Sequence, residues 1–531
     1  MKKIMTFIIG LTLLAGFTAC SNDLLDTSPT DSTSGTTIFK TDATALVALN
    51  GIYRSMYNYG WSAGNTHQNF GNTSTNLFAD LMGEDMVQHE QGSGWFWYDY
   101  NYTVRSRYTS KNWRSYATWN YYYTLICNAN YIIAQENSIG GDTSKVNYIV
   151  ANAYAIRAYS YFYLIQIFQQ TYQGHETLPG VPLYTEPTSS SSVGKPRGTV
   201  QDVYDQINKD LDYAIMLFDV SHVDQMDKSH IDYYVANGIK AKVALVQGDW
   251  AAASTAAKNA LSKTTEPELM PASQITSGFN DVNLGGVLWG ATIIADQATS
   301  YASFFSHMDS RDEVNMYGTA SRKCISSWLF KKIPATDARI AWFNDVVSPE
   351  AASGIAVSYN QKKYKFKDYT TYLGDYIFMR NEEMLLIEAE AECRLSHFAA
   401  ARALMLKLGA VRDPANYPTR LGTFSDSKVM TMDAVGETTA STPNTITLLD
   451  EILLQRRIEL WCEVGRIFDI QRLGIGFTRK FAGTNHPTDA QLTSFNGGEK
   501  TPAYKEFILT IPQTEFDGNT SLVQSTDQNP M

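Results

Sequence analysis

Charged side chains and cysteines are both scarce in this chain of 531 residues. Asp, Glu, Lys and Arg together make up 18% of it, the formal net charge is −11, and no run of Lys or Arg is longer than two residues. Nucleic acids are bound mainly through clustered Lys and Arg, so this composition excludes a nucleic-acid surface. The five cysteines include no CxxC pair; beyond Cys20 they are Cys127, Cys324, Cys393 and Cys462. Because three of these four lie in apolar helical contexts, we expect buried free thiols.

Patterns of metal ligands are missing as well. The eight histidines form neither an HExxH nor an HxH motif, so a transition-metal site lacks its ligands. Four aspartates surround a polar loop that could hold calcium, but they lack the regular spacing and the glycine of an EF-hand loop. They are Asp219, Asp224, Asp227 and Asp232. A solvated loop is the favoured interpretation, and we expect no cofactor.

One dense group of carboxylates has to be weighed as a catalytic centre. Glu388 and Glu392 are four residues apart and share a helix face, so a glycosidase pair is conceivable. Catalytic pairs, however, usually face each other across a cleft from separate elements. With Arg380 and Arg394 close by in the sequence, solvated or salt-bridged helix faces are the better interpretation. The full group is Glu382, Glu383, Glu388, Glu390 and Glu392. We therefore expect no enzyme here.

The first forty residues indicate export. Residues 1–19 carry two lysines and then an apolar stretch too short to span a bilayer, which is typical of a signal peptide. Cys20 follows Phe17, Thr18 and Ala19, which resembles a bacterial lipoprotein box, so we expect Cys20 to be lipidated. Residues 20–40 are small and polar and suit a flexible tether. The pattern predicts a lipid anchor, with the folded body outside the membrane.

Helical periodicity dominates the rest of the chain. Apolar residues spaced by three and four predict helices over 41–57, 119–134, 146–168 and 200–218. The third of these is apolar on more than one face and should be buried. With 44% hydrophobic residues, the chain has enough apolar side chains for a large core.

Two later segments resemble each other and predict helical hairpins. Residues 241–261 and 389–409 each contain a helix, a turn, one aromatic residue (Trp250 or Phe398), three alanines and a second helix. This is the design of a tetratricopeptide-like hairpin. We predict a mostly α fold of such hairpins with a few short strands. A single domain over 41–531 would carry loop-rich insertions at about 58–118 and 275–375.

At this point the residues carry a family resemblance. The stretch EILLQRRIELWCEVGRIFDIQRLG, residues 451–474, resembles the C-terminal signature of the SusD/RagB family of outer-membrane lipoproteins. The segments RAYSYFYL at 157–164, YIFMRNEEMLLIEAEAE from 376 and FILTIPQTE near the end agree, in family order. Trp119, Tyr123, Ile126 and Asn130 also stand at the family's spacing. The resemblance implies a single tetratricopeptide-like domain that serves nutrient uptake at the cell surface. It also implies a partner, a TonB-dependent SusC-like transporter that the lipoprotein covers like a lid.

The candidate ligand contacts begin with GSGWFWYDYNY, residues 92–102, in a chain that has 32 tyrosines. As an extended segment it would place Trp95, Trp97, Asp99 and Asn101 on one face and the other aromatics on the opposite, core-facing side. Indole rings stack on the apolar face of a pyranose, while amide and carboxylate groups bond its hydroxyls. We therefore predict that this face contacts a sugar.

Two further groups complete the candidates. The polar segment 296–317 supplies Tyr301 and Tyr317 as candidate ligand contacts. Trp61, in a turn flanked by glycines, is a weaker candidate. The resulting hypothesis is an outer-membrane lipoprotein, lipid-anchored at the cell surface, that captures an oligosaccharide and passes it unchanged to its transporter. A peptide ligand of the RagB type is the main alternative, because Arg105, Arg107 and Arg114 follow the aromatic run and could bind a carboxylate. A lipoprotein glycoside hydrolase is a remote alternative, and a lid that never touches ligand is a further one.

Overall fold

About half of the described residues are helical in the computed structural model, which describes residues 38–103, 109–189, 191–266, 268–344, 357–431, 447–492 and 507–530. The predicted signal peptide and Cys20 lie outside the described residues. The longer helices are α3 (Asp42–Ser55), α4 (Asn72–Met82), α7 (Trp113–Ile133), α8 (Thr143–Phe168), α9 (Val200–Ser221), α10 (Tyr233–Gln247), α11 (Trp250–Leu261), α15 (Asn381–Arg394), α16 (Phe398–Arg412), α18 (Leu448–Glu459) and α19 (Arg466–Leu473). The shorter ones are α5 (Trp97–Tyr100), α12 (Phe304–Met308), α13 (Tyr317–Ala320), α14 (Ser327–Phe330), α17 (Tyr417–Leu421), α20 (Gln513–Gly518) and α21 (Gln524–Asp527).

The strands of the described residues form three separate antiparallel pairs. These pairs are β1 (Met86–Gln88) with β5 (Lys323–Ile325), β2 (Pro179–Pro182) with β3 (Arg197–Thr199), and β4 (Val287–Ala291) with β6 (Tyr376–Arg380). Each pair joins segments from different parts of the loop-rich regions or brackets one long loop. The predicted mostly α class with few short strands is confirmed.

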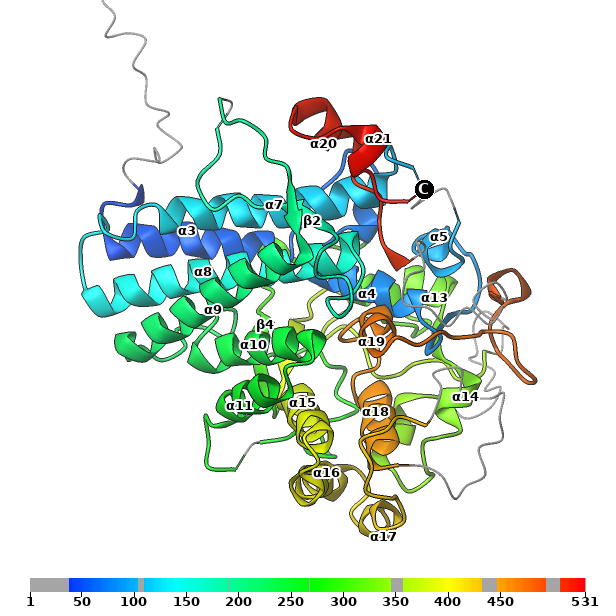
Figure 1. Cartoon of the computed structure of the whole chain (residues 1–531). Coiled ribbons are helices and arrows are strands. Elements are labelled where there is room, and N and C mark those ends of the chain that lie inside the picture. Colours follow the sequence, from blue (N-terminus) through cyan, green and yellow to red (C-terminus); the bar gives the residue numbers. More distant parts are fainter. Residues whose placement is uncertain are drawn as a thin grey trace, which may run out of the picture.

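The helices form a layered body on one side, and the short elements gather on the other (Figure 1). α3, α7, α8 and α9 run alongside one another, and α10, α11, α15 and α16 continue the stack. α8 is the central helix: from Tyr148 to Phe168 nearly every side chain is buried, because both of its flanks are covered by neighbouring helices. The expectation of a helix buried on more than one face is confirmed here.

The predicted hairpins are present as α10–α11 and α15–α16. In the first, Gly248 ends α10 in the left-handed region (φ 71°), which a residue without a Cβ adopts at no steric cost. The Asp249 carboxylate then accepts the Ala252 N–H and begins α11. Ala253, Ala256 and Ala257 lie buried at the contact, where small side chains let the helices approach closely. Local sequence therefore specifies the turn as well as the helices.

Loss of the Asp249 cap of α11 should lower the free energy of unfolding by a small, measurable amount. We expect Asp249→Ala to lower the free energy of unfolding by about 1 kcal/mol, because the Ala252 N–H loses its side-chain acceptor. Asp249→Asn keeps an acceptor oxygen and should stay within about 0.5 kcal/mol of wild type. Chemical denaturation of the three proteins in parallel measures the difference. Equal losses for both variants would contradict the capping role.

The loop-rich insertions are less uniform than predicted. The stretch 58–118 contains α4, all eleven residues of which are buried, so this helix belongs to the core. Its end is tied to α19 by the Asp80 carboxylate, which accepts the N–H groups of Gly465 and Arg466. The insertions also contribute the short helices α5, α13 and α14 at one side of the body, whereas β4 of the second insertion lies beside α10 (Figure 1).

The C-terminal signature forms a buried ion-pair network. Glu459, at the end of α18, accepts hydrogen bonds from Arg339, Arg380 and Arg412, and all four side chains are at most 1% exposed. In the same signature, Arg456 pairs with Asp469, Arg457 and Arg466 with Glu84, and Arg472 with Glu390. These pairs join α18 and α19 to α4, α15, α16 and the segment before Trp342. These charges of the signature therefore have a structural role.

Candidate functional site

The aromatic run is not extended, and this corrects part of the predicted site. Phe96 adopts a left-handed conformation (φ 61°), and residues 97–100 form the single-turn helix α5. Alternation between two faces is therefore lost. Trp97 is 3% exposed and packs against Tyr100, with ring centroids 5.6 Å apart. The predicted ligand contact of Trp97 is wrong, because its indole lies in the core.

Asp99 and Asn101 are also engaged inside the protein. The Asp99 carboxylate accepts two hydrogen bonds from the Arg114 guanidinium, at 2.6 and 3.2 Å, and its side chain is 1% exposed. The predicted ligand contact of Asp99 is therefore wrong. Asn101 is half-buried, and with its amide oriented to satisfy both groups it accepts from Trp97 Nε1 (2.9 Å) and donates to the Trp97 carbonyl (3.1 Å). Its polar atoms face Trp97, and the prediction of a ligand-facing Asn101 is not supported.

Trp95, in contrast, joins an aromatic cluster built from three distant segments. Its ring centroid lies 5.8 Å from Tyr317 and 5.3 Å from His67, and Tyr301 lies 5.4 Å from Tyr317 and 5.6 Å from His67. We call these four side chains the aromatic platform. Tyr301 is 47% exposed, and the other three are half-buried. Three of the predicted ligand contacts, Trp95, Tyr301 and Tyr317, are thus brought together.

A buried layer behind the platform holds it in place. His307 is fully buried, stacks on Tyr317 at 5.0 Å and hydrogen-bonds the His67 carbonyl through Nε2 at 2.6 Å. Since a carbonyl oxygen only accepts, Nε2 carries the proton, and burial keeps the pKa of His307 well below its ordinary value, so the ring is neutral. The Phe96 N–H donates to Gln68 Oε1 at 2.7 Å, which joins the aromatic run to the loop that carries His67.

Two polar groups of the platform pair with each other. His67 Nδ1 and the Tyr317 hydroxyl lie 2.6 Å apart. Burial raises the pKa of Tyr317, so its phenol remains protonated at neutral pH. None of the four side chains carries a permanent charge. The platform therefore presents ring faces with neutral polar edges, a surface suited to a ligand that is apolar on one face and hydroxylated at its rim.

Trp61 lies apart from the platform. Its ring packs edge-on against Tyr121 with centroids 5.1 Å apart, and its Nε1 donates to the Asn58 carbonyl at 2.9 Å. The following Ser62 sits in a Gly-x-Ser-x-Gly pattern that several hydrolases use for a nucleophile. Here its hydroxyl donates to the Gly64 carbonyl and accepts from the Asn69 amide, with no imidazole among these partners. The pattern therefore has a local structural role.

The carboxylate group of α15 is ion-paired and buried. Glu382 pairs with Arg380 (2.9 Å), and Glu383 pairs with Lys242 (3.0 Å). Each of the five glutamates is at most 7% exposed. The expectation that these glutamates form salt bridges is confirmed, and the alternative that they are solvated is wrong. Such pairs hold helices together and face no cleft.

Metal ligands and disulfides are absent from the part of the chain that the structure describes. It holds no group of three or more His, Cys, Asp or Glu placed to bind a metal ion. In the suggested calcium loop, Asp227 accepts from Ser229, and Asp232 caps α10 by accepting the Val235 N–H. Cys393 and Cys462 are buried free thiols as expected, Cys324 is buried as well, and Cys127 is free and half-buried. Among the described residues, no helix is long and apolar enough to span a bilayer.

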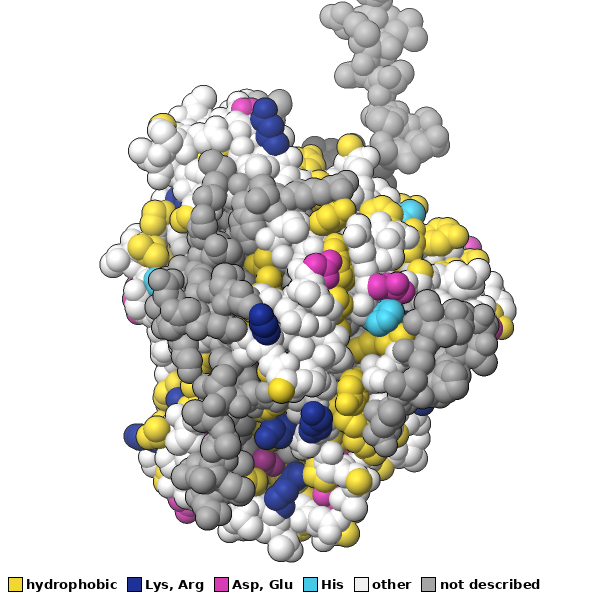
Figure 2. All heavy atoms as spheres, turned by 90° about the vertical axis from the view of Figure 1, so that its right-hand side faces the viewer, with side chains coloured by type: hydrophobic (Ala, Val, Ile, Leu, Met, Phe, Trp, Pro, Cys, Tyr) yellow, Lys and Arg dark blue, Asp and Glu magenta, His cyan; other side chains and the backbone are white. Residues whose placement is uncertain are grey.

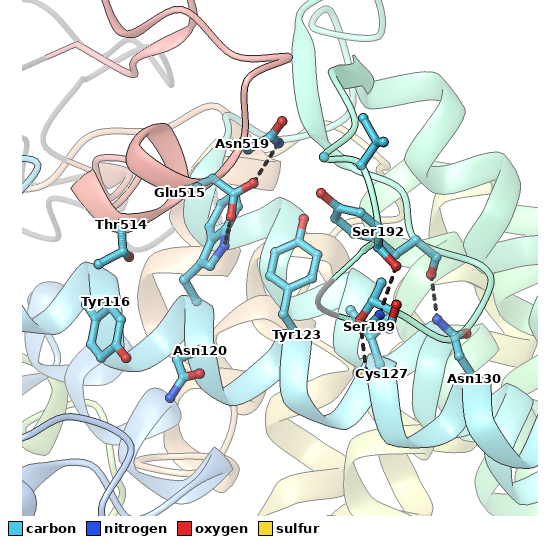
Figure 3. Close-up of a pocket in the computed structure, with 17 residues that line it drawn as sticks. Tyr116, Asn120, Tyr123, Cys127, Asn130, Ser189, Ser192, Thr514, Glu515 and Asn519 are labelled. Carbon is cyan, nitrogen blue, oxygen red and sulfur yellow. Dashed lines mark hydrogen bonds between the residues drawn. The ribbon is translucent and has the colours of Figure 1, made fainter.

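A cavity of about 400 Å³ beside α7 was not predicted as a site. Its floor is one face of α7, including Tyr116, Asn120 and Tyr123, and its walls are the loop after β2 and the helix α20 (Figure 3). We call it the α7 cavity. The spacing of Trp119, Tyr123 and Asn130 was visible in the sequence, but the walls come from segments far along the chain.

The side of the molecule that carries α5, α13 and α14 is shown in Figure 2. Over its described part, hydrophobic side chains are scattered among polar ones, and charged groups are isolated or in small clusters. No broad basic field dominates the described atoms of this face. Such a surface suits a neutral ligand better than a polyanion.

Comparison with known proteins gives consistent results. Residues 25–245 match a SusD-like family model described as starch-binding and associating with the outer membrane, and residues 354–530 match the SusD family model. SusD-like protein P2 of Formosa agariphila is 25% identical over 98% of this chain and 99% of its own.

Solved structures show the same fold. A SusD-like carbohydrate-binding protein from Bacteroides vulgatus has a TM-score of 0.72 at 23% identity, covering 92% of this chain and 98% of its own. A laminarin-binding SusD-like protein has a TM-score of 0.64 at 20% identity, covering 93% and 100%. At these identities the structures establish the fold alone.

Proposed function

We propose that this chain, which belongs to the SusD/RagB family, captures oligosaccharide at the cell surface and delivers it unchanged to a TonB-dependent SusC-like transporter. The observation that carries the proposal is the aromatic platform. Trp95 lies about two hundred residues from Tyr301 and Tyr317 in the sequence, yet the Tyr317 ring lies within 6 Å of both other rings, and His67 contacts all three. A platform of neutral aromatic side chains fits the apolar face of a sugar ring.

The location and anchoring form part of the same proposal. The description of the matched family includes association with the outer membrane. Together with the lipoprotein-like sequence ending at Cys20, this supports a lipid-anchored protein on the cell surface. The polar residues 20–40 would then tether the body beside its transporter. Binding, and no chemical conversion, is the proposed activity.

The structure weakens the argument for a peptide ligand. Of the three arginines that suggested a carboxylate pocket, Arg114 is 1% exposed and pairs with Asp99. Arg105 and Arg107 lie outside the described residues. The guanidinium of Arg114 is already committed inside the protein, so it cannot anchor a peptide carboxylate without exposing a buried Asp99.

The test is a binding screen of the chain lacking residues 1–20. Calorimetry against neutral glycans, including laminarin and starch fragments, and against peptide mixtures measures the ligand class. We expect a glycan to bind and Tyr301→Ala to lower its affinity about tenfold, since about 1–1.5 kcal/mol of stacking is lost. Leu406→Ala removes a comparably exposed apolar side chain (41%) from α16, which contributes to neither the platform nor the α7 cavity, and is the control. Binding of peptides alone would overturn the proposed ligand class.

A further inference from the structure

The α7 cavity has the composition of a second small-ligand site. Its volume of about 400 Å³ lies at the lower end of the range for ligand pockets, roughly 300–1,000 Å³. None of its lining residues belongs to the aromatic platform. The rings of Tyr116, Tyr123 and Tyr184 contribute apolar faces, and Tyr116 is 36% exposed. Hydroxyl and amide groups make up much of the remaining lining (Figure 3).

Polar atoms in the cavity have unused hydrogen-bonding capacity. Glu515 Oε2 accepts from Trp119 Nε1 (3.1 Å) and Oε1 accepts from Asn519 Nδ2 (2.8 Å). A carboxylate has about four acceptor positions, so each oxygen retains one. Asn120 donates to the Trp61 carbonyl (3.1 Å), and among the described residues nothing donates to its side-chain oxygen. These acceptors lie along the floor and one wall, where hydroxyl donors of a ligand could reach them (Figure 3).

The walls are fixed to each other before any ligand binds. Asn519, directly after α20, donates to the Lys195 carbonyl (2.8 Å), and the Ser521 hydroxyl donates to the Gly194 carbonyl (2.7 Å). These bonds tie the C-terminal segment to the loop after β2. The Tyr131 hydroxyl donates to the Thr188 carbonyl (3.0 Å) and ties the same loop to α7. A cavity braced on both sides loses little entropy when it is filled, which favours a ligand site over a crevice that collapses.

The charges select the class of ligand. Among the lining residues there is no Lys, Arg or His, and Glu515 is the one ionisable carboxylate. The nearest cation, Lys195, lies over the Tyr184 ring, 5.8 Å from its centroid, and is not part of the lining. An anionic ligand would therefore meet the Glu515 carboxylate and no lining cation, whereas a neutral polyhydroxylated one finds ring faces, amides and acceptor oxygens together. We infer that the α7 cavity is a second saccharide site, which takes a neutral mono- or disaccharide. The inference deepens the proposed function, but it stands on residues that the platform does not use.

A blocking substitution with a matched control tests the site. Ser189 lines the cavity and is exposed, so Ser189→Trp fills the cavity without burying a new group in the core. Ser191→Trp places the same side chain two residues away in the same loop, at an exposed position that does not line the cavity. Asn120→Ala removes the open acceptor. Each is made in the wild-type background and in a Trp95→Ala/Tyr301→Ala background that disables the platform.

Calorimetry with a panel of neutral mono- and disaccharides gives the outcome. We expect at least one to bind the platform-disabled protein at a stoichiometry near one, to lose at least tenfold in affinity with Ser189→Trp or Asn120→Ala, and to be unaffected by Ser191→Trp. If no panel sugar binds the platform-disabled protein, or if Ser189→Trp leaves every affinity within twofold, the inference is overturned. Binding that is lost only with the platform supports the proposed function and overturns the second site. Binding at the cavity alone supports the second site and overturns the platform as the glycan site.

Discussion

Replacing Glu459 with Gln is expected to lower the free energy of unfolding by about 4 kcal/mol, because removing one partner of a buried ion pair typically costs about 3–5 kcal/mol. Arg412 donates to both oxygens of Glu459, at 2.8 and 2.9 Å, and Arg339 and Arg380 approach to 3.2 and 3.1 Å. Gln preserves the volume but presents an NH₂ group to guanidinium donors and removes one negative charge that the three arginines share. Each arginine keeps a second carboxylate partner, which is Asp337 for Arg339 and Glu382 for Arg380 and Arg412. The loss therefore arises from the shared carboxylate, which these remaining pairs replace only in part.

Glu459 also makes the free energy of unfolding depend on pH. Burial alone opposes ionisation of Glu459, but the guanidiniums of Arg412, Arg380 and Arg339 outweigh it and hold its pKa well below the ordinary value. The ionised form is therefore favoured more in the folded than in the unfolded chain. Its stabilisation is fully present above the unfolded pKa of about 4.3 and is lost as the pH falls towards the folded value.

Urea unfolding at pH 7 and at steps down to pH 3.5 measures both effects. Wild type should lose stability as the pH falls below about 4.5, and Glu459→Gln should start lower and show a shallower decline. Asp212→Asn is the control, since it breaks an exposed pair with Lys240 and should cost at most about 1 kcal/mol. Equal effects of the two substitutions at pH 7 would contradict a special role for Glu459. Where Glu459→Gln does not fold, Glu459→Asp, which keeps the charge, should recover a folded protein.

The helical body was predictable because its signals are local. The spacing of apolar residues predicts α7, α8 and α9, and Trp250 with its alanines predicts the α10–α11 hairpin. The ion-pair partners of the signature could not be predicted, because Arg339 lies 120 residues from Glu459 and no local pattern connects them.

The two faces of the aromatic run could not be assigned from the local sequence. A period of two assigns faces only if the chain is extended, and a left-handed Phe96 followed by one helical turn removes that premise. The partner of Asp99 is Arg114, which belongs to the next long helix. Aromatic composition identified Trp95, Tyr301 and Tyr317 as candidates, but only folding brings them together, since no sequence spacing relates them. The place of His67 in the platform depends on the same long-range contacts.

Removal of the two indoles of the run, which are two residues apart, should affect different properties. Loss of Trp95 should lower glycan affinity, and loss of Trp97 should lower the free energy of unfolding. Trp95→Ala takes a half-buried ring from the platform, so we expect glycan affinity to fall about 30-fold or more, the effect of losing a central aromatic contact of about 2 kcal/mol. Its stability should change far less than that of Trp97→Ala. Trp97 is 3% exposed, and its removal should cost about 3–5 kcal/mol of folding free energy while the folded fraction still binds.

Measuring both properties for both variants separates packing from recognition. Calorimetry at a temperature where each variant is folded gives the affinity, and urea unfolding gives the stability. A Trp95→Ala protein that binds glycan like wild type would remove Trp95 from the site. A folded Trp97→Ala protein that loses more affinity than Trp95→Ala would place recognition on the buried indole, against the geometry. The expected crossed result follows from one structural fact: the left-handed Phe96 between them turns Trp95 towards Tyr317 and His67 and Trp97 towards Tyr100.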